Sequence, residues 1–397
     1  TEPGAPGTVT KGSKRQPVGS FARRTYSKKR KATDRGLLLR PKGRGGWRGH
    51  LPERQEPTVT QTGSQHMKKF LLSATSAAAL FGAGAAHAEC SDISIAVFSW
   101  QAAEAHAYVD QFILNNGYGC NVALVAGDTV PTIASMVEKG QPDLVPEGNP
   151  GAMGAVYASG LAEERIVPIG TGITEGSESG WYIPQYLADA HPEIKTVEDA
   201  VAHPELFPAP EDASKGGVIQ GPQGWGDTVV TAQLYKALDL DNKGFTLVPS
   251  GSAAALDGAI TKAYEQKQGF IAAYWAPTSL LAQYPMQRLT MAYDPEEWTR
   301  CTTVQDCPDP KPNYWQSSPE LTVATKAFAD RTDIPEVKDY LSKHAWTQAE
   351  VGALMVWMTE NQANGEDAAK WFIQNKPEVW TKWVPADVAE KVKAAAQ

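Results

Sequence analysis

The chain has 397 residues, of which 42% are hydrophobic and 21% are charged, and this ordinary globular composition excludes a chain that is disordered throughout. Its charge is unevenly spread: residues 1–66 carry 15 Lys and Arg against 4 Asp and Glu, whereas residues 89–397 have a net charge of −21. The acidity of this main part argues against nucleic acid as a partner.

The chain begins with a basic stretch, residues 1–66, that differs in composition from everything after it. It is rich in Gly and Pro and contains RRTYSKKRKATDRG, which fits either a solvated tail or an arm for nucleic acid. From Met67 the chain reads MKKFLLSATSAAALFGAGAAHA, which has the lysines, apolar run and small-residue ending of a secretory signal peptide. We therefore predict a signal peptide over residues 67–88, translation from Met67, and a non-native, disordered upstream extension over residues 1–66.

Export follows from this signal. Because no later segment is apolar enough to cross a bilayer, the sequence predicts a protein released into the periplasm of a Gram-negative bacterium. A lipid anchor on Cys90 is the alternative, but Glu89 stands before it where such a signal needs a small residue.

Four cysteines follow the signal, and export makes disulfides permissible. Cys90 and Cys120 each precede a strand-like run, and a helical stretch separates the two runs. Parallel strands joined by one helix lie side by side, so we predict a Cys90–Cys120 bridge. Cys301 and Cys307 are six residues apart, which suits a bridge that closes a hairpin in a loop. The alternative is four free thiols.

The pattern after the signal predicts an α/β protein with two lobes. A first unit alternates strands and helices in the order 93–98, 102–115, 122–126, 131–139 and 143–148. A second unit has strands at 181–184, 216–221, 245–251 and 269–275, with helices at 227–238 and 252–268. A strand at 321–325 and three helical stretches complete the chain.

This order predicts lobe I over residues 89–177, lobe II over 178–282, and a return to lobe I over 283–397. Each lobe is expected to be a mainly parallel sheet flanked by helices, with a ligand cleft between the lobes. The lobes are expected to close about chain crossings near residues 176–180 and 277–283.

Tryptophans and polar residues gather where the predicted strands end, and ligands of parallel sheets bind at the carboxyl ends of strands. Aromatic faces attract diffuse cations, whereas a trimethylated nitrogen has no proton to donate to an ordinary hydrogen-bond acceptor. The alternative for each single tryptophan is a place in the core. The predicted ligand-binding residues are Trp100, Glu147, Asn149, Trp181, Tyr182, Trp225, Gly226 and Trp275.

Three motifs carry a resemblance to a known family: QGPQGWGD, YWAPTSL and PNYWQSSPELTVA. With them, residues 89–397 resemble the substrate-binding proteins of glycine betaine, choline and related ABC transporters. The resemblance implies the two-lobed fold of a type II-like periplasmic binding protein and a cage of aromatic rings that includes Trp225 and Trp275. It also implies a small methylated amine as ligand, a membrane permease as partner, and a monomeric protein.

One departure from the family pattern bears on the ligand. Where much of the family has Asn-Trp-x-Pro, this chain has Glu147, Gly148, Asn149 and Pro150. A carboxylate attracts a cationic head and repels a ligand carboxylate. The combination of several tryptophans with one glutamate is similar to the pattern in the trimethylamine N-oxide-binding proteins of marine bacteria. The resemblance thus favours trimethylamine N-oxide, followed by glycine betaine and then choline.

Other functions have less support in the sequence. It contains no GxSxG, HExxH, CxxC or P-loop motif, which argues against an enzyme. The enzymatic alternative is a secreted hydrolase on an α/β frame. No cofactor is expected to be required. A binding protein that feeds a chemotaxis sensor would have the same sequence features. The acids Asp294, Asp306 and Asp309 suit either a structural calcium ion or a solvated acidic loop.

Overall fold

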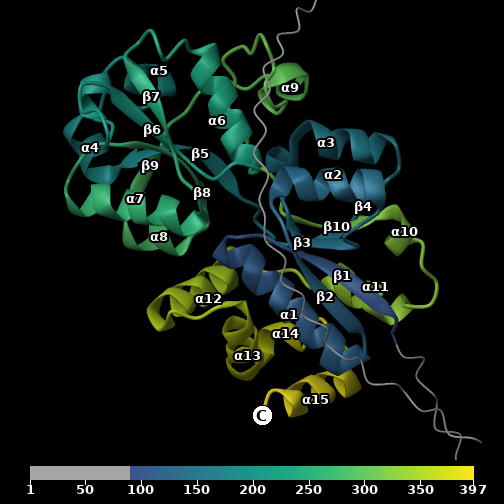
Figure 1. Ribbon diagram of the computed structural model, residues 1–397. Helices are drawn as coiled ribbons and strands as arrows, with labels where there is room; N and C mark the ends of the chain where they lie inside the picture. Colours follow the sequence, from purple (N-terminus) through teal and green to yellow (C-terminus); the bar gives the residue numbers. More distant parts are fainter. Residues whose placement is uncertain (1–89) are drawn as a thin grey trace, which may run out of the picture. The chain divides into compact units, whose positions relative to one another are not determined.

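The computed structural model describes residues 90–397, so the predicted upstream extension and signal peptide lie outside the described residues. Two five-stranded sheets form the framework, in the orders β2-β1-β3-β10-β4 and β7-β6-β8-β5-β9 (Figure 1). The strands of the first sheet are β1 (Asp92–Val97), β2 (Asn121–Ala126), β3 (Leu144–Gly148), β4 (Ile166–Thr171) and β10 (Leu321–Thr325). Those of the second are β5 (Glu178–Pro184), β6 (Gly216–Gln220), β7 (Phe245–Pro249), β8 (Ile271–Ala276) and β9 (Met286–Arg288).

Helices cover both faces of each sheet. The helices of the first lobe are α1 (Gln101–Tyr118), α2 (Thr129–Lys139), α3 (Pro150–Ala162), α10 (Lys326–Ala329), α11 (Pro335–Lys343), α12 (Gln348–Asn361), α13 (Gly365–Asn375), α14 (Pro377–Trp380) and α15 (Ala386–Ala395). The remaining helices are α4 (Gln185–Ala190), α5 (Val197–Val201), η1 (Pro204–Leu206), α6 (Gly226–Ala237), α7 (Ala253–Glu265), α8 (Ser279–Gln283), α9 (Pro295–Glu297) and the π-helical turn η2 (Trp298–Thr302).

In each sheet one strand runs against the direction of the others. β1 runs parallel to β2 and β3, and β6 runs parallel to β7 and β8, as predicted. β10 is antiparallel to β3 and β4, and β5 is antiparallel to β8 and β9. Each sheet is therefore mainly parallel, as predicted, with one strand that opposes the other four. As a consequence, the first residues of β5 and β10 lie beside the last residues of the parallel strands.

Alternation along the strands builds one core on each face of a sheet. In β1, Ile93 and Ile95 belong to the core shared with α1 and the C-terminal helices, whereas Ala96 joins the core beneath α2 and α3. In β5, Trp181 and Tyr182 likewise belong to opposite cores of the second lobe. The blue helix α1 and the yellow helices α13 and α15 pack together, so the two ends of the described chain share one lobe (Figure 1).

The chain crosses between the lobes twice, and the second crossing differs from the prediction. Residues 277–283 stay in the second lobe, because α8 leads into β9, which pairs with β5. The return is made just before β10, where Ser318 pairs with Ser177 of the first crossing. We therefore propose that the second lobe extends beyond the predicted limit at residue 282, at least to Arg288.

Both predicted disulfides are present. Cys90–Cys120 joins the chain just before β1 and β2, whose residues Asp92 and Asn121 are register partners. Cys301–Cys307 connects η2 to the loop that follows it, so this bridge closes a helical turn rather than a hairpin. Within residues 90–397, no helix has both the length and the apolar character that crossing a membrane requires.

Candidate ligand-binding site

A small cavity lies between the lobes, at the carboxyl ends of β1, β3 and β8. Its volume is about 40 Å³. Its walls bring together six of the eight predicted ligand-binding residues. The lining residues are Phe98, Trp100, Thr129, Glu147, Asn149, Ala152, Ser177, Ser179, Trp225, Gly226, Asp227, Trp275 and Glu320.

Three tryptophan rings that line this cavity lie close together. The ring centroids of Trp100 and Trp225 are 5.4 Å apart, those of Trp225 and Trp275 are 5.3 Å apart, and those of Trp100 and Trp275 are 6.3 Å apart. The planes of these pairs are inclined at 79°, 79° and 72°, so the three rings are nearly perpendicular to one another. We call this arrangement of Trp100, Trp225 and Trp275 the aromatic corner. A compact group with methyls pointing in several directions matches such a corner, because each wall can meet a different methyl.

Local structure sets the place of each ring. Trp100 immediately precedes α1, Trp225 is the N-cap residue of α6, and Trp275 is the last residue but one of β8. Phe98, which the sequence analysis did not single out, stacks on Trp100 with centroids 4.9 Å apart. The indole N–H of Trp225 donates to Asp128 of the first lobe over 3.1 Å, so this ring also links the lobes.

Three carboxyl groups also line the cavity, and we call them its acidic wall. Glu147 accepts a hydrogen bond of 2.8 Å from the indole N–H of Trp100. Glu320 accepts from Asn149 and Ser177, over 2.8 Å and 2.5 Å. The side chain of Asp227 accepts from Trp315 Nε1 and Ser179 Oγ, over 2.7 Å and 3.1 Å. No lysine or arginine lines this cavity in the described part of the chain, so the wall is acidic.

Burial makes these acids weaker than usual. Burial, followed by the nearby charge of Glu320, raises the pKa of Glu147 to about 8, although the Trp100 hydrogen bond opposes the shift. Burial raises the pKa of Glu320 to about 7 and that of Asp227 to about 6, again against hydrogen bonds that stabilise the ionised form. The cavity therefore changes its charge between about pH 6 and pH 8, and a bound cation would favour the ionised carboxylates.

Asn149 lines the cavity but uses its side chain on the protein. Its Oδ1 accepts from Ala152 N and caps α3, and its Nδ2 donates to Glu320 and Ser177. The amide thus holds Glu320, which the sequence analysis missed.

The structure does not bring Trp181 and Tyr182 to the cavity, which corrects their predicted role. Trp181 is fully buried in the second lobe and donates its indole N–H to Thr231. Tyr182 is buried on the other face of the sheet and donates its hydroxyl proton to Glu178 O. Because β5 runs antiparallel to β8, the residue beside Trp275 is Ser179, and the side chains further along β5 lie deep in the lobe.

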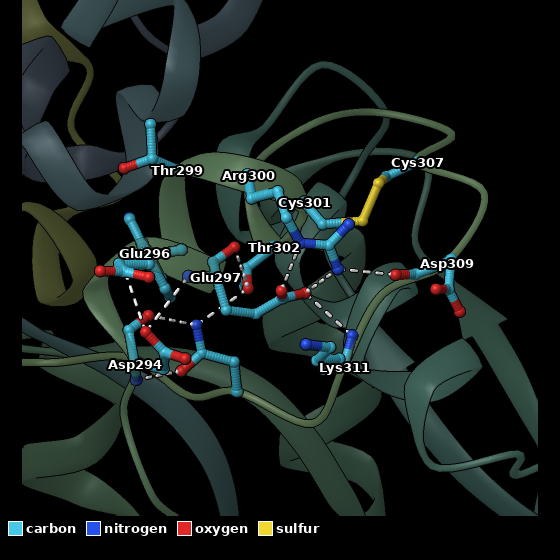
Figure 2. A network of polar contacts seen from close by, with 12 residues as sticks. Asp294, Glu296, Glu297, Thr299, Arg300, Cys301, Thr302, Cys307, Asp309 and Lys311 are labelled. Atoms are coloured by element: carbon cyan, nitrogen blue, oxygen red, sulfur yellow. Dashed lines mark hydrogen bonds and ion pairs between the residues drawn. A yellow bond between two sulfur atoms is a disulfide. The ribbon is translucent and has the colours of Figure 1, made fainter. Parts of the chain in front are cut away.

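The acids predicted to hold calcium, Asp294, Asp306 and Asp309, do not form a metal-binding group in the described residues. Figure 2 shows Asp294 and Asp309 on opposite sides of Glu297 and Arg300. Asp294 caps α9 by accepting from Glu296 N and Glu297 N, and Asp309 contributes its backbone carbonyl to Arg300. Arg300 also donates two hydrogen bonds to the buried Glu297, so an ion pair occupies the centre of this loop. Among residues 90–397, no group of three or more acidic, histidine or cysteine side chains is arranged to hold a metal ion.

This arrangement predicts different effects for two aspartates of the loop. We expect Asp294→Ala to lower the free energy of unfolding by about 1 kcal/mol, because it removes an N-cap. Asp309→Ala keeps the backbone carbonyl and should change stability by less than about 0.5 kcal/mol. Urea unfolding with EGTA and with added calcium measures both. Equal losses that occur only when calcium is present would contradict this account of the loop.

Residues 91–375 match the family described as "OpuAC: Substrate binding domain of ABC-type glycine betaine transport system". A curated relative, the glycine betaine/carnitine transport binding protein GbuC of Listeria monocytogenes, is 25% identical over 169 residues. That match covers 43% of this chain and 48% of the relative, so the chain spans about half the length of the curated relative it matches.

Solved structures agree in fold. The glycine betaine/L-proline-binding protein ProX from Borrelia burgdorferi has a TM-score of 0.60 at 16% identity, over 76% of this chain and 99% of that chain. Lactococcal OpuAC complexed with glycine betaine has a TM-score of 0.57 at 20% identity, over 74% and 100%. A choline-binding protein in complex with choline has a TM-score of 0.59 at 18% identity, over 77% and 98%. The predicted two-lobed binding-protein fold is confirmed.

Proposed function

Because the chain belongs to the OpuAC family of substrate-binding domains of ABC-type glycine betaine transport systems, we propose that it captures a small trimethylammonium-type solute between its lobes. The observation that carries this proposal is the pairing of three nearly perpendicular indole rings with three carboxyl groups in a cavity without a basic side chain. Rings attract the methylated cation and the acids favour its charge.

The rest of the role is part of the same proposal. The protein is a binder rather than an enzyme, acts as a monomer in the periplasm, and delivers its solute to the membrane permease of an ABC importer. Closure of the lobes around the solute would present the loaded form to that permease.

Among methylated amines, we propose trimethylamine N-oxide as the preferred ligand. Its oxygen needs a hydrogen-bond donor, and Glu147 and Glu320, with their raised pKa values, can carry the proton that supplies one. Choline also fits an acidic wall, because it is a permanent cation without a carboxylate. Glycine betaine carries a carboxylate that the three acids would repel, which now places it behind choline.

The acidic wall predicts opposite pH dependence for two ligands. Choline should bind more tightly as pH rises from 6 to 9, because Glu147 and Glu320 ionise and attract its charge. Trimethylamine N-oxide should bind less tightly over the same range, because ionisation removes the proton that its oxygen accepts. One linked proton changes Kd by at most about tenfold per pH unit.

Isothermal titration calorimetry at pH 6, 7, 8 and 9 measures both slopes, and a Glu147→Gln variant is the control. Gln cannot ionise, so its slopes should be shallower for both ligands. Parallel slopes for the two ligands in the wild-type protein would contradict the proposed part of the acids in binding.

A further inference from the structure

A buried histidine, His106, lies behind the acidic wall and is not part of the cavity lining. It belongs to α1 and is 2% exposed, and its Nδ1 is 3.1 Å from Oε2 of Glu147. The other oxygen of Glu147, Oε1, accepts from the indole N–H of Trp100. Each oxygen of this carboxyl group therefore faces a different group of the protein.

The surroundings of His106 leave Glu147 as its polar neighbour. Within the described residues, neither ring nitrogen has a partner that meets the geometry of a regular hydrogen bond, and the same holds for Glu147 Oε2. The imidazole stacks on Trp346, with ring centroids 4.7 Å apart and planes at 27°. The stack holds the ring in place, with Nδ1 3.1 Å from Glu147 Oε2, although the ring N–H is not aligned with that oxygen as in a regular hydrogen bond.

The charge state of His106 suits a carboxyl group that gains and loses a proton. Burial, followed by the charge of His344, lowers the pKa of His106 to about 3, so its ring is neutral at physiological pH. A neutral imidazole can donate to an ionised carboxylate or accept from a protonated one. His106 can therefore lie beside Glu147 whether the carboxyl group is protonated or ionised, without a large loss of free energy.

Other titratable groups near His106 are engaged elsewhere. Asp110, one turn further along α1, accepts from the hydroxyl of Tyr340 and pairs with Nδ1 of His344. Nε2 of His344 lies 2.7 Å from the hydroxyl of Thr322 in β10. Glu104 of α1 accepts from the backbone of α13. Of the charged groups packed around this part of α1, Glu147 is the one that also lines the cavity.

We propose that His106 is a positioning residue for the ligand site: it orients the carboxyl group of Glu147, which in turn holds the ring of Trp100 in the aromatic corner. This inference rests on the proposed function. Removing the imidazole leaves Glu147 Oε2 buried without a polar neighbour, and a carboxyl group in that position either rotates or keeps its proton. Either response loosens Trp100 or weakens the attraction for a cation.

Two substitutions of His106, one of them repeated in a Glu147→Gln variant, test whether His106 acts on Trp100 through Glu147. His106→Leu removes the polar edge, whereas His106→Asn places an amide near the former Nδ1. We expect His106→Leu to raise the Kd for choline by at least about fivefold at pH 7 and to move the midpoint of its pH profile upward. His106→Asn should stay within about threefold of the wild-type protein. In the Glu147→Gln background, His106→Leu should no longer move the pH profile, because the group that it acts through is gone.

A wild-type measurement does not depend on how well the variants fold. In ¹⁵N-histidine-labelled protein, the ring nitrogens of His106 should remain neutral from pH 6 to 9 and should shift when choline is added. Two outcomes would overturn the inference and leave the proposed function standing. One is that trimethylated ligands bind the wild-type protein without shifting these signals. The other is that the pH profile of choline binding is unchanged in His106→Leu. A wild-type protein that binds no trimethylated amine would overturn both.

Discussion

Gly226→Ala is expected to abolish tight binding of any trimethylated amine while leaving each lobe folded. Gly226 opens α6 at the point where the second lobe meets α3 of the first. A Cβ atom added there would lie 1.5 Å from the backbone oxygen of Ala152. Backbone cannot yield as a flexible side chain does, so the lobes would have to separate. We expect a loss of at least about 3 kcal/mol in binding, more than a hundredfold in Kd.

A second glycine provides the matched control for this substitution. Gly258 lies inside α7 of the same lobe, and a Cβ atom there would meet nothing within 4 Å. Gly258→Ala should therefore bind like the wild-type protein and gain about 1 kcal/mol of helix stability. Calorimetry gives the affinity, and small-angle X-ray scattering with saturating ligand shows whether the lobes close. A Gly226→Ala protein that still binds and closes would contradict the packing of α6 against α3.

Trp275→Leu is expected to weaken choline binding by about 2 kcal/mol, or roughly thirtyfold in Kd, because one desolvated aromatic wall is lost. Trp275 is only partly buried, so the fold should tolerate the change. Trp357→Leu is the control: Trp357 is also partly buried, but it stacks on Trp371 in the C-terminal helices and does not line the cavity.

The measurement is the ratio of the two variant affinities at one pH, with urea unfolding to show that both proteins are folded. Equal affinities for Trp275→Leu and Trp357→Leu would remove Trp275 from the binding site. The fully buried Trp181 offers a further contrast, since its truncation should lower the free energy of unfolding, by about 3–5 kcal/mol for a change to Ala.

The sequence was sufficient to predict much of the fold, because its signals are local. Alternation and periodicity placed β1, β2 and β3 and the helices between them within a few residues. Both disulfides followed from the position of cysteines relative to those elements. α3 and β4 were not predicted: α3 contains four glycine and proline residues among its 13, which obscures its helical pattern.

The candidate site was predicted only where strands run parallel. Trp100, Glu147, Trp225 and Trp275 follow from the rule that ligands meet the carboxyl ends of parallel strands. That rule fails for a strand that enters from the other lobe in the opposite direction, because its first residues then reach the cavity. Ser179 of β5 and Glu320, directly before β10, were missed for this reason. Direction within a mixed sheet is set by contacts distant in sequence, which no local pattern records.

The central claim is that a methylated cation binds in the corner of three indole rings beside three carboxyl groups. Calorimetric titration of the protein with choline and with its uncharged tert-butyl analogue, in which carbon replaces the nitrogen, tests this most directly. The two compounds have nearly the same shape, so a difference in affinity reports the charge. We predict that choline binds at least about tenfold more tightly than the analogue, since cation–π contacts and the acidic wall act only on the cation. Equal affinities, or no binding of either choline or trimethylamine N-oxide, would contradict the account.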